Sequence, residues 1–75
     1  MKSFRFVKIT IGDGQFLEMY DENGNPIEAP NKVFPKFALY DGLKKLYQDG
    51  YELKPIGCSN DRSGKIVCFL IAEKD

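Results

Sequence analysis

Histidine and tryptophan are absent from this chain of 75 residues, and cysteine occurs only twice. Without histidine, the chain lacks the commonest general base and the usual partner of a serine or cysteine nucleophile. A carboxylate pair such as Asp13 with Glu18 could in principle transfer protons, but no pattern buries either group or separates the two pKa values. We therefore expect no catalytic residues and no enzymatic activity.

Metal ligands are also scarce. Cys58 and Cys68 have nine residues between them and no histidine to join them, so they cannot supply the four ligands of a structural zinc site. The segment that begins at Asp21 resembles the start of a calcium loop, but Pro26 occupies the position where that loop requires glycine. We expect neither a metal nor a cofactor.

Net charge is missing as well, because 11 basic side chains balance 11 acidic ones. A neutral chain has no overall field to attract phosphate backbones or anionic lipids, which disfavours nucleic acid as a partner. Lys2, Arg5 and Lys8 make the beginning of the chain locally basic. Weak binding of single-stranded nucleic acid is therefore a third alternative.

Long apolar runs do not occur. The longest, residues 66–72, has seven residues, whereas a membrane-spanning helix needs about 20. Residues 4–11 are interrupted by Arg5 and Lys8 and do not form the apolar region of a secretory signal. We expect a cytoplasmic protein without membrane contact. In a reducing cytoplasm we expect Cys58 and Cys68 to be small buried hydrophobic residues, and a disulfide between them is not favoured.

The first half of the chain predicts a hairpin and a long loop. Residues 4–11 and 15–20 have the alternation of strands, and the glycines that flank Asp13 permit the tight reversal between them. Residues 21–35 contain many turn formers and three of the four prolines. We expect this segment to be an exposed, acidic loop.

The second half predicts a helix over residues 35–49, with Pro35 in its first turn and Gly50 at its end. Gly42 inside the helix indicates a close approach to the sheet. Its apolar positions are Phe37, Leu39, Tyr40, Leu43, Leu46 and Tyr47, and we expect Phe37, Tyr40, Leu43 and Tyr47 to pack on the sheet.

Two further strands follow the helix. Residues 51–58 contain Pro55, which cannot donate to a strand ladder and predicts an edge strand or a bulge. Residues 65–72 are apolar without alternation, as is typical of a strand that is covered on both faces. The prediction is one α+β domain over residues 1–75, with the order ββαββ, a four-stranded mainly antiparallel sheet and one helix on one face.

The helix end and the strand after it read Gly50, Tyr51, Glu52, Leu53 and Lys54. Together with the final apolar strand, this segment resembles small bacterial domains grouped as domain of unknown function 4177, in which it usually reads Gly, Trp, Glu, Leu, Val. The resemblance covers residues 37–74. It implies a compact domain of a sheet and a helix, and it implies no functional residues.

One helix can cover only one face of the sheet, so the other face predicts an interface. We expect a small regulatory or interaction domain that binds a protein partner, most simply a second copy of itself. The expected interface residues are Phe4, Phe6, Phe16, Tyr20, Ile56, Cys68 and Leu70. The alternative is a small-ligand site between the loop and the sheet edge. Its expected residues are Tyr20, Lys32, Tyr51 and Arg62.

Overall fold

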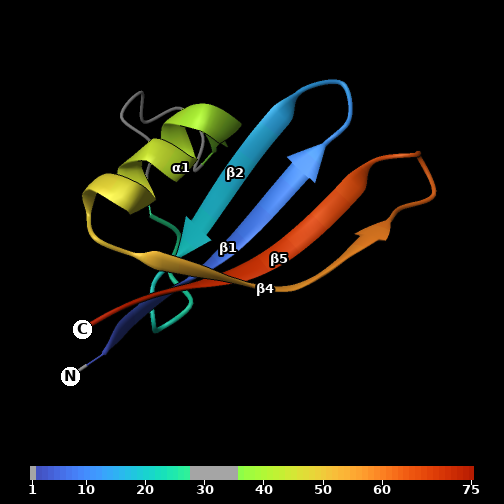
Figure 1. Ribbon diagram of the computed structural model, residues 1–75. Coiled ribbons are helices and arrows are strands. Elements are labelled where there is room, and N and C mark those ends of the chain that lie inside the picture. Colours follow the sequence, from blue (N-terminus) through green and yellow to red (C-terminus); the bar gives the residue numbers. More distant parts are fainter. Residues whose placement is uncertain (1, 28–35) are drawn as a thin grey trace.

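A single antiparallel sheet with a helix packed on one face makes up the described part of the computed structural model, residues 2–27 and 36–75 (Figure 1). The elements are β1 (Ser3–Ile11), β2 (Gln15–Tyr20), β3 (Phe37–Ala38), α1 (Leu39–Gln48), β4 (Glu52–Asn60) and β5 (Ile66–Lys74). The strand order across the sheet is β3-β2-β1-β5-β4. Two of the three nine-residue strands, β1 and β5, therefore lie side by side near its centre.

The α+β class is confirmed, but the predicted four strands are wrong because the sheet has five. The additional strand is β3, whose Phe37 and Ala38 pair with Leu17 and Phe16 of β2. Phe37 is buried, as the sequence predicted, but it enters the core from a strand instead of a helix. Apolar spacing alone does not distinguish these two routes, and Ala38 is extended, so α1 begins only at Leu39.

Two turns have the same hydrogen-bond pattern. One follows β2, and the other connects β4 to β5 at the opposite end of the sheet. Asp21 and Asp61 each accept backbone N–H groups from the residues two and four positions later, all at 2.9 Å. The glycines three positions after them, Gly24 and Gly64, have φ angles of 84° and 85°, which glycine adopts without strain. The Asp-x-x-Gly sequence therefore encodes a complete turn in both places.

The first of these turns revises part of the predicted loop over residues 21–35. Pro26 forms an isolated bridge to Tyr20, and the Ile27 amide donates to the Met19 carbonyl at 2.9 Å. The chain thus returns along β2 immediately after the turn. Residues 28–35, including Lys32 and the expected helix start at Pro35, lie outside the described residues.

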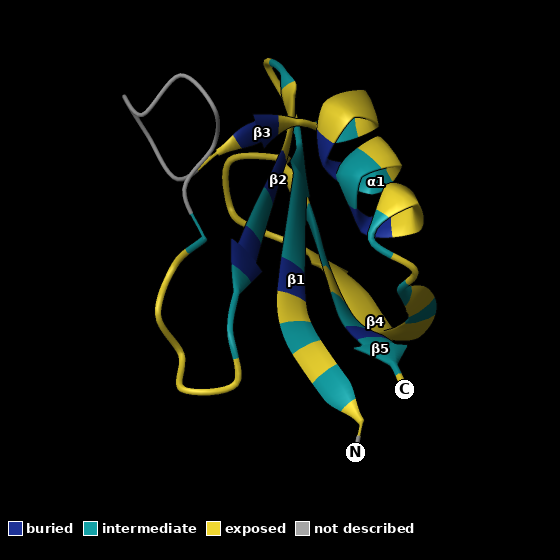
Figure 2. Ribbon diagram, turned by 90° about the vertical axis from the view of Figure 1, so that its left-hand side faces the viewer, coloured by how far each residue is buried: buried dark blue, intermediate teal, exposed yellow. Residues whose placement is uncertain are grey.

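The core forms where α1 meets β2 and its neighbours (Figure 2). Gly42 faces the sheet so closely that a Cβ atom there would lie 2.9 Å from Leu17 Cδ2, which confirms the predicted close approach. Leu46 lies one turn further along the helix and is fully buried. The buried apolar residues are Val7, Leu17, Met19, Phe37, Leu46 and Ala72.

Two of the predicted core tyrosines are on the outside of the helix. Tyr40 is 74% exposed and Tyr47 is 83% exposed. Each residue of an α-helix turns by about 100°, so a contact face centred on Gly42 and Leu46 directs both tyrosines away from the sheet. Leu43 is half-buried at the border of this face and packs against the core.

The predictions for the last two strands hold in their main features. β4 is an edge strand, and its ladder with β5 is interrupted by a bulge between Pro55 and Gly57. This agrees with the expected effect of Pro55. Gly50 has a φ angle of 85° directly after the helix, which confirms its predicted role in ending α1.

The cysteines differ from their prediction. Cys58 is directly opposite Cys68 in the ladder, and the two form a disulfide with their Cα atoms 4.0 Å apart. The disulfide was not favoured from the sequence, and it forms because this register pairs Asn60 with Ile66 and so brings the two cysteines together. Cys58 is exposed and Cys68 is half-buried, so neither is the small buried hydrophobic residue that was expected.

Replacing Leu46 by alanine should lower the free energy of unfolding by about 2–5 kcal/mol, because a fully buried leucine leaves a cavity. Leu43 is only half-buried, so Leu43→Ala should cause a smaller loss. Chemical denaturation of Leu46→Ala and Leu43→Ala measures both. Tyr47→Ala is the control and should change stability by less than about 0.5 kcal/mol. Equal losses at positions 46 and 47 would contradict this helix orientation.

Candidate functional site

Phenylalanines gather on the sheet face that is turned away from α1. Strand alternation and register direct Phe4 and Phe6 of β1, Phe16 of β2 and Phe69 of β5 to this face. Each of the four is between 39% and 46% exposed. We call this surface the far face, and its half-buried members Tyr20 and Ile71 both pair with Phe6.

The far face is apolar because β1 and β5 have hydrophobic side chains at successive positions. Val7 points toward the helix and is buried, whereas its neighbour Phe6 points the other way and is partly exposed. In β5, Leu70 lies on the helix side and Phe69 lies on the far face, as their pairing with Val7 and Lys8 shows. Since the described residues include one helix on one side, the rings on the other side remain in contact with solvent.

A polar group is embedded in this apolar surface. Lys8 and Glu18 are directly opposite each other on β1 and β2. Glu18 accepts a hydrogen bond from the Tyr20 hydroxyl at 2.7 Å and lies 3.9 Å from the Lys36 ammonium. The hydrogen bond to Glu18 raises the pKa of Tyr20, with smaller contributions from burial and from the negative charge. The tyrosine therefore stays protonated and acts as a donor.

Charges of both signs border the far face where β4 and β5 meet. Lys54 and Glu73 form an ion pair at 2.9 Å, and the Lys2 ammonium lies 3.9 Å from the same carboxylate. The hydrogen bond between them raises the pKa of Lys54 and lowers that of Glu73. Both groups are at the surface, where such pairs contribute little to stability. Their effect is to set the pattern of charge around the phenylalanines.

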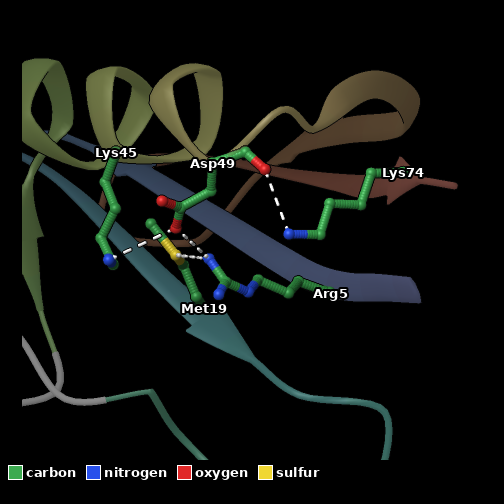
Figure 3. A network of polar contacts seen from close by, with 5 residues as sticks. All are labelled: Arg5, Met19, Lys45, Asp49 and Lys74. Atoms are coloured by element: carbon green, nitrogen blue, oxygen red, sulfur yellow. Dashed lines mark hydrogen bonds and ion pairs between the residues drawn. The ribbon is translucent and has the colours of Figure 1, made fainter.

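A second polar group lies on the helix side, where α1 ends (Figure 3). The Asp49 carboxylate accepts a hydrogen bond from Arg5 Nη1 at 3.3 Å and pairs with Lys45 Nζ at 3.3 Å. Lys74 Nζ donates to the Asp49 carbonyl at 3.1 Å, which places a cation at the negative end of the helix dipole. These contacts connect α1 to β1 and β5.

Tyr51 completes this cluster. The Arg5 guanidinium carbon lies 4.5 Å from the centre of its ring, and the Lys74 ammonium lies 4.8 Å from it. Both distances are typical of cation–π contacts. Because the cations bind Asp49 and the Tyr51 ring, the cluster fastens the helix end to the sheet.

The far face contains only part of the predicted interface. Phe4, Phe6, Phe16 and Tyr20 lie on it, as the strand register shows. Cys68 and Leu70 are on the helix side of the sheet, because they pair with Ile9 and Val7. Ile56 is 62% exposed in the bulge of the edge strand. Phe69 lies on the far face because it pairs with Lys8. It was not predicted, because the sequence assigned its neighbours Cys68 and Leu70 to this face, and only the pairing with β1 distinguishes the two sides of an uninterrupted apolar strand.

The residues predicted for a ligand site are dispersed. Tyr20 lies at the end of β2 on the far face, and Tyr51 lies beside Arg5 on the helix side. Arg62 is in the β4–β5 turn, at the opposite end of the sheet. An open cavity of about 250 Å³ does exist near Tyr51. Its lining consists of Ser3, Phe4, Arg5, Asp21, Glu22, Asn23, Ile27 and Tyr51.

Comparisons with known proteins give no further information on this site. No protein family, no curated protein and no solved structure matches the chain. Within the described ranges, acidic and cysteine side chains form no group of three or more that could hold a metal ion. No helix among the described residues is long and apolar enough to cross a membrane.

Asp49 predicts an acid-dependent loss of stability. Burial raises the pKa of Asp49, but hydrogen bonds and positive charge from Lys45 and Arg5 outweigh it, so the pKa lies below its ordinary value of 3.8. A carboxyl group with a lowered pKa in the native state stabilises the fold at pH values above its pKa in the unfolded chain. This stabilisation is lost as the pH falls through the pKa of the native state. At pH 7, Asp49→Asn should therefore be less stable than the wild type, and the difference should shrink below about pH 4.

Denaturation curves from pH 7 to pH 2 measure this difference. Asp13→Asn is the matched control, because it removes a carboxylate from the exposed turn between β1 and β2. Its stability difference from the wild type should be small at every pH. A constant difference for Asp49→Asn across the acid range would show that the Asp49 contacts do not act through its charge.

Proposed function

We propose that this protein is a non-enzymatic interaction domain that associates with a second copy of itself through the far face. The observation that supports the proposal is the set of four phenylalanines, each between 39% and 46% exposed, on one face of the sheet. Contiguous exposed apolar patches on small domains mark interaction surfaces. We include a regulatory or adaptor role in this proposal, because a small domain of this kind acts through what it binds.

The dimensions of the far face suit a protein partner. β1 and β5 have nine residues each, so they are about 30 Å long, and four neighbouring strands span about 20 Å. The resulting face of about 600 Å² approaches the roughly 800 Å² per partner that is common in stable complexes. Its phenylalanines are spread over β1, β2 and β5, whereas sites for small molecules are concave and enclose their ligand.

Charge favours a copy of the same chain as the partner. In a two-fold dimer the same surface of both copies forms the interface. Each cation of one copy can therefore pair only with an anion from the same surface of the other copy. The far face carries Lys8 and Lys54 together with Glu18 and Glu73, which satisfies this requirement. The chain also has no net charge to keep its copies apart.

Marginal stability adds a reason for association. The described residues bury only six apolar side chains, and a domain of this size hides a smaller share of its surface than a larger protein does. Covering the phenylalanines would contribute about 25 cal/mol for each Å² of apolar surface removed from water. Anything that binds only the folded state raises its stability with concentration.

Small-ligand binding is the alternative, and the cavity beside Tyr51 is the observation that favours it. Asp21, Glu22 and Arg5 supply polar groups of both signs to its wall. The cavity is open and, at about 250 Å³, smaller than most drug-sized ligand sites. The third alternative, single-stranded nucleic acid, gains no support from the basic residues of β1. Arg5 and Lys2 are paired with Asp49 and Glu73, and Lys8 lies directly opposite Glu18.

Self-association should appear as a dimer mass in light scattering and as a melting temperature that rises with protein concentration. Phe6→Glu places a charge in the middle of the far face and should give a monomer with an unchanged fold by circular dichroism. Tyr47→Glu introduces the same charge on the exposed outer surface of α1 and should leave the dimer intact.

Two results would contradict the proposal. One is a strictly monomeric wild type at high micromolar concentration with a melting temperature independent of concentration. The other is a dimer that Tyr47→Glu disrupts and Phe6→Glu does not. The first result would direct attention to the ligand alternative, and the second would place the interface on the helix.

A further inference from the structure

The disulfide between Cys58 and Cys68 joins β5 to an exposed part of β4. Every residue from position 54 to position 66 is exposed. This segment is held by its ladder with β5, by the Asp61 turn and by the disulfide itself. The buried core lies elsewhere, around Leu17 and Leu46. The covalent bond therefore fastens the outer half of the β4–β5 hairpin and is not enclosed by the core.

The two sulfur atoms differ in how a thiol can reach them. Exchange requires a thiolate to attack one sulfur from the side opposite to the departing sulfur. For Cys58 this side is the outer edge of β4, the last strand of the described sheet. For Cys68 it is the side of β1, where Ile9 is the directly paired residue. Cys58 is also exposed, whereas Cys68 is half-buried. The geometry thus favours attack at Cys58.

We propose that the Cys58–Cys68 disulfide is a reversible exchange site for dithiol reductants, which attack the sulfur of Cys58. In the first step, one thiolate of the dithiol bonds to the Cys58 sulfur, the bond between the two cysteines breaks, and Cys68 departs as a thiolate. In the second step, the other thiol of the reductant, as its thiolate, attacks the sulfur bonded to Cys58 and releases Cys58. Two electrons pass from the dithiol to the protein, and the reductant becomes a disulfide.

Reduction has a local structural consequence. Residues 56–66 lose their only covalent cross-connection, while the helix and its contacts with β2 remain. The outer part of β4 can then separate from β5 without unfolding of the core. Disulfides in reducing compartments are usually transient and redox-active, and an exposed one on an edge strand suits that behaviour.

The rate of reduction in the native state tests the proposal. Oxidised full-length protein is mixed with increasing dithiothreitol, quenched with an alkylating reagent and analysed by mass. The rate should rise in proportion to the dithiol concentration and should not change with low concentrations of urea. A rate that levels off at the rate of global unfolding, or that rises steeply with urea, would show that the bond opens only when the protein unfolds and would overturn the proposal.

The position of attack gives a second test. A short pulse of a monothiol, glutathione, forms a mixed disulfide that peptide mass spectrometry can locate. We expect most of the adduct on Cys58. Equal labelling, or labelling mainly on Cys68, would overturn the assigned direction of attack.

Hydrogen exchange then measures the local effect. After reduction, the amides of residues 56–60 should exchange about tenfold faster or more, and those of β2 should be unchanged. The double variant Cys58→Ser with Cys68→Ser is the matched control and should reproduce the reduced pattern without any reductant. If this variant does not fold, the core depends on the bond, and the proposal of a local switch is wrong.

Discussion

The contact between one ten-residue helix and a wider sheet determines most of this structure. Helix α1 packs over β2 and β3, and the buried core extends from there along one sheet face to Val7 of β1 and Ala72 of β5. Gly42 allows the helix backbone to approach Leu17, and Leu46 fills the space beside it. The far face and the outer half of the β4–β5 hairpin therefore remain in contact with solvent. The proposed interface and the proposed exchange site lie in these two uncovered regions.

Polar contacts fix the helix where the apolar contact ends. Asp49 binds Arg5 and Lys45, and Lys74 binds its carbonyl, so three cations surround the last turn of α1 (Figure 3). The cluster lies on the side of the sheet opposite to the phenylalanines. A charge introduced on the far face should thus leave the attachment of the helix intact. Such a variant can lose association and still fold.

The sequence predicted those features of the fold that depend on single residues or on their immediate neighbours. The alternation of β2, the stop at Gly50 and the interruption at Pro55 follow from backbone preferences of individual residues. The sequence did not predict β3, because Phe37 satisfies a helical stripe as well as a strand. It also misplaced Tyr40 and Tyr47, since a broad apolar stripe does not reveal which side a small helix buries. The opposition of Cys58 and Cys68 depends on the bulge in β4, and a one-residue change of register separates such a pair. The sequence did identify Phe4, Phe6 and Phe16 for the candidate surface. They alternate with residues of the other sheet face, and a single helix can cover only one of the two faces.

The central claim is that the far face meets its own copy. Nuclear Overhauser contacts between chains, observed in a mixture of isotope-labelled and unlabelled protein, test it most directly. The account predicts contacts between chains from the rings of Phe6 and Phe69, and none from Tyr40 or Tyr47. Contacts between chains that involve only Tyr40 and Tyr47 would contradict it. The absence of any contact between chains at high micromolar concentration would contradict it as well.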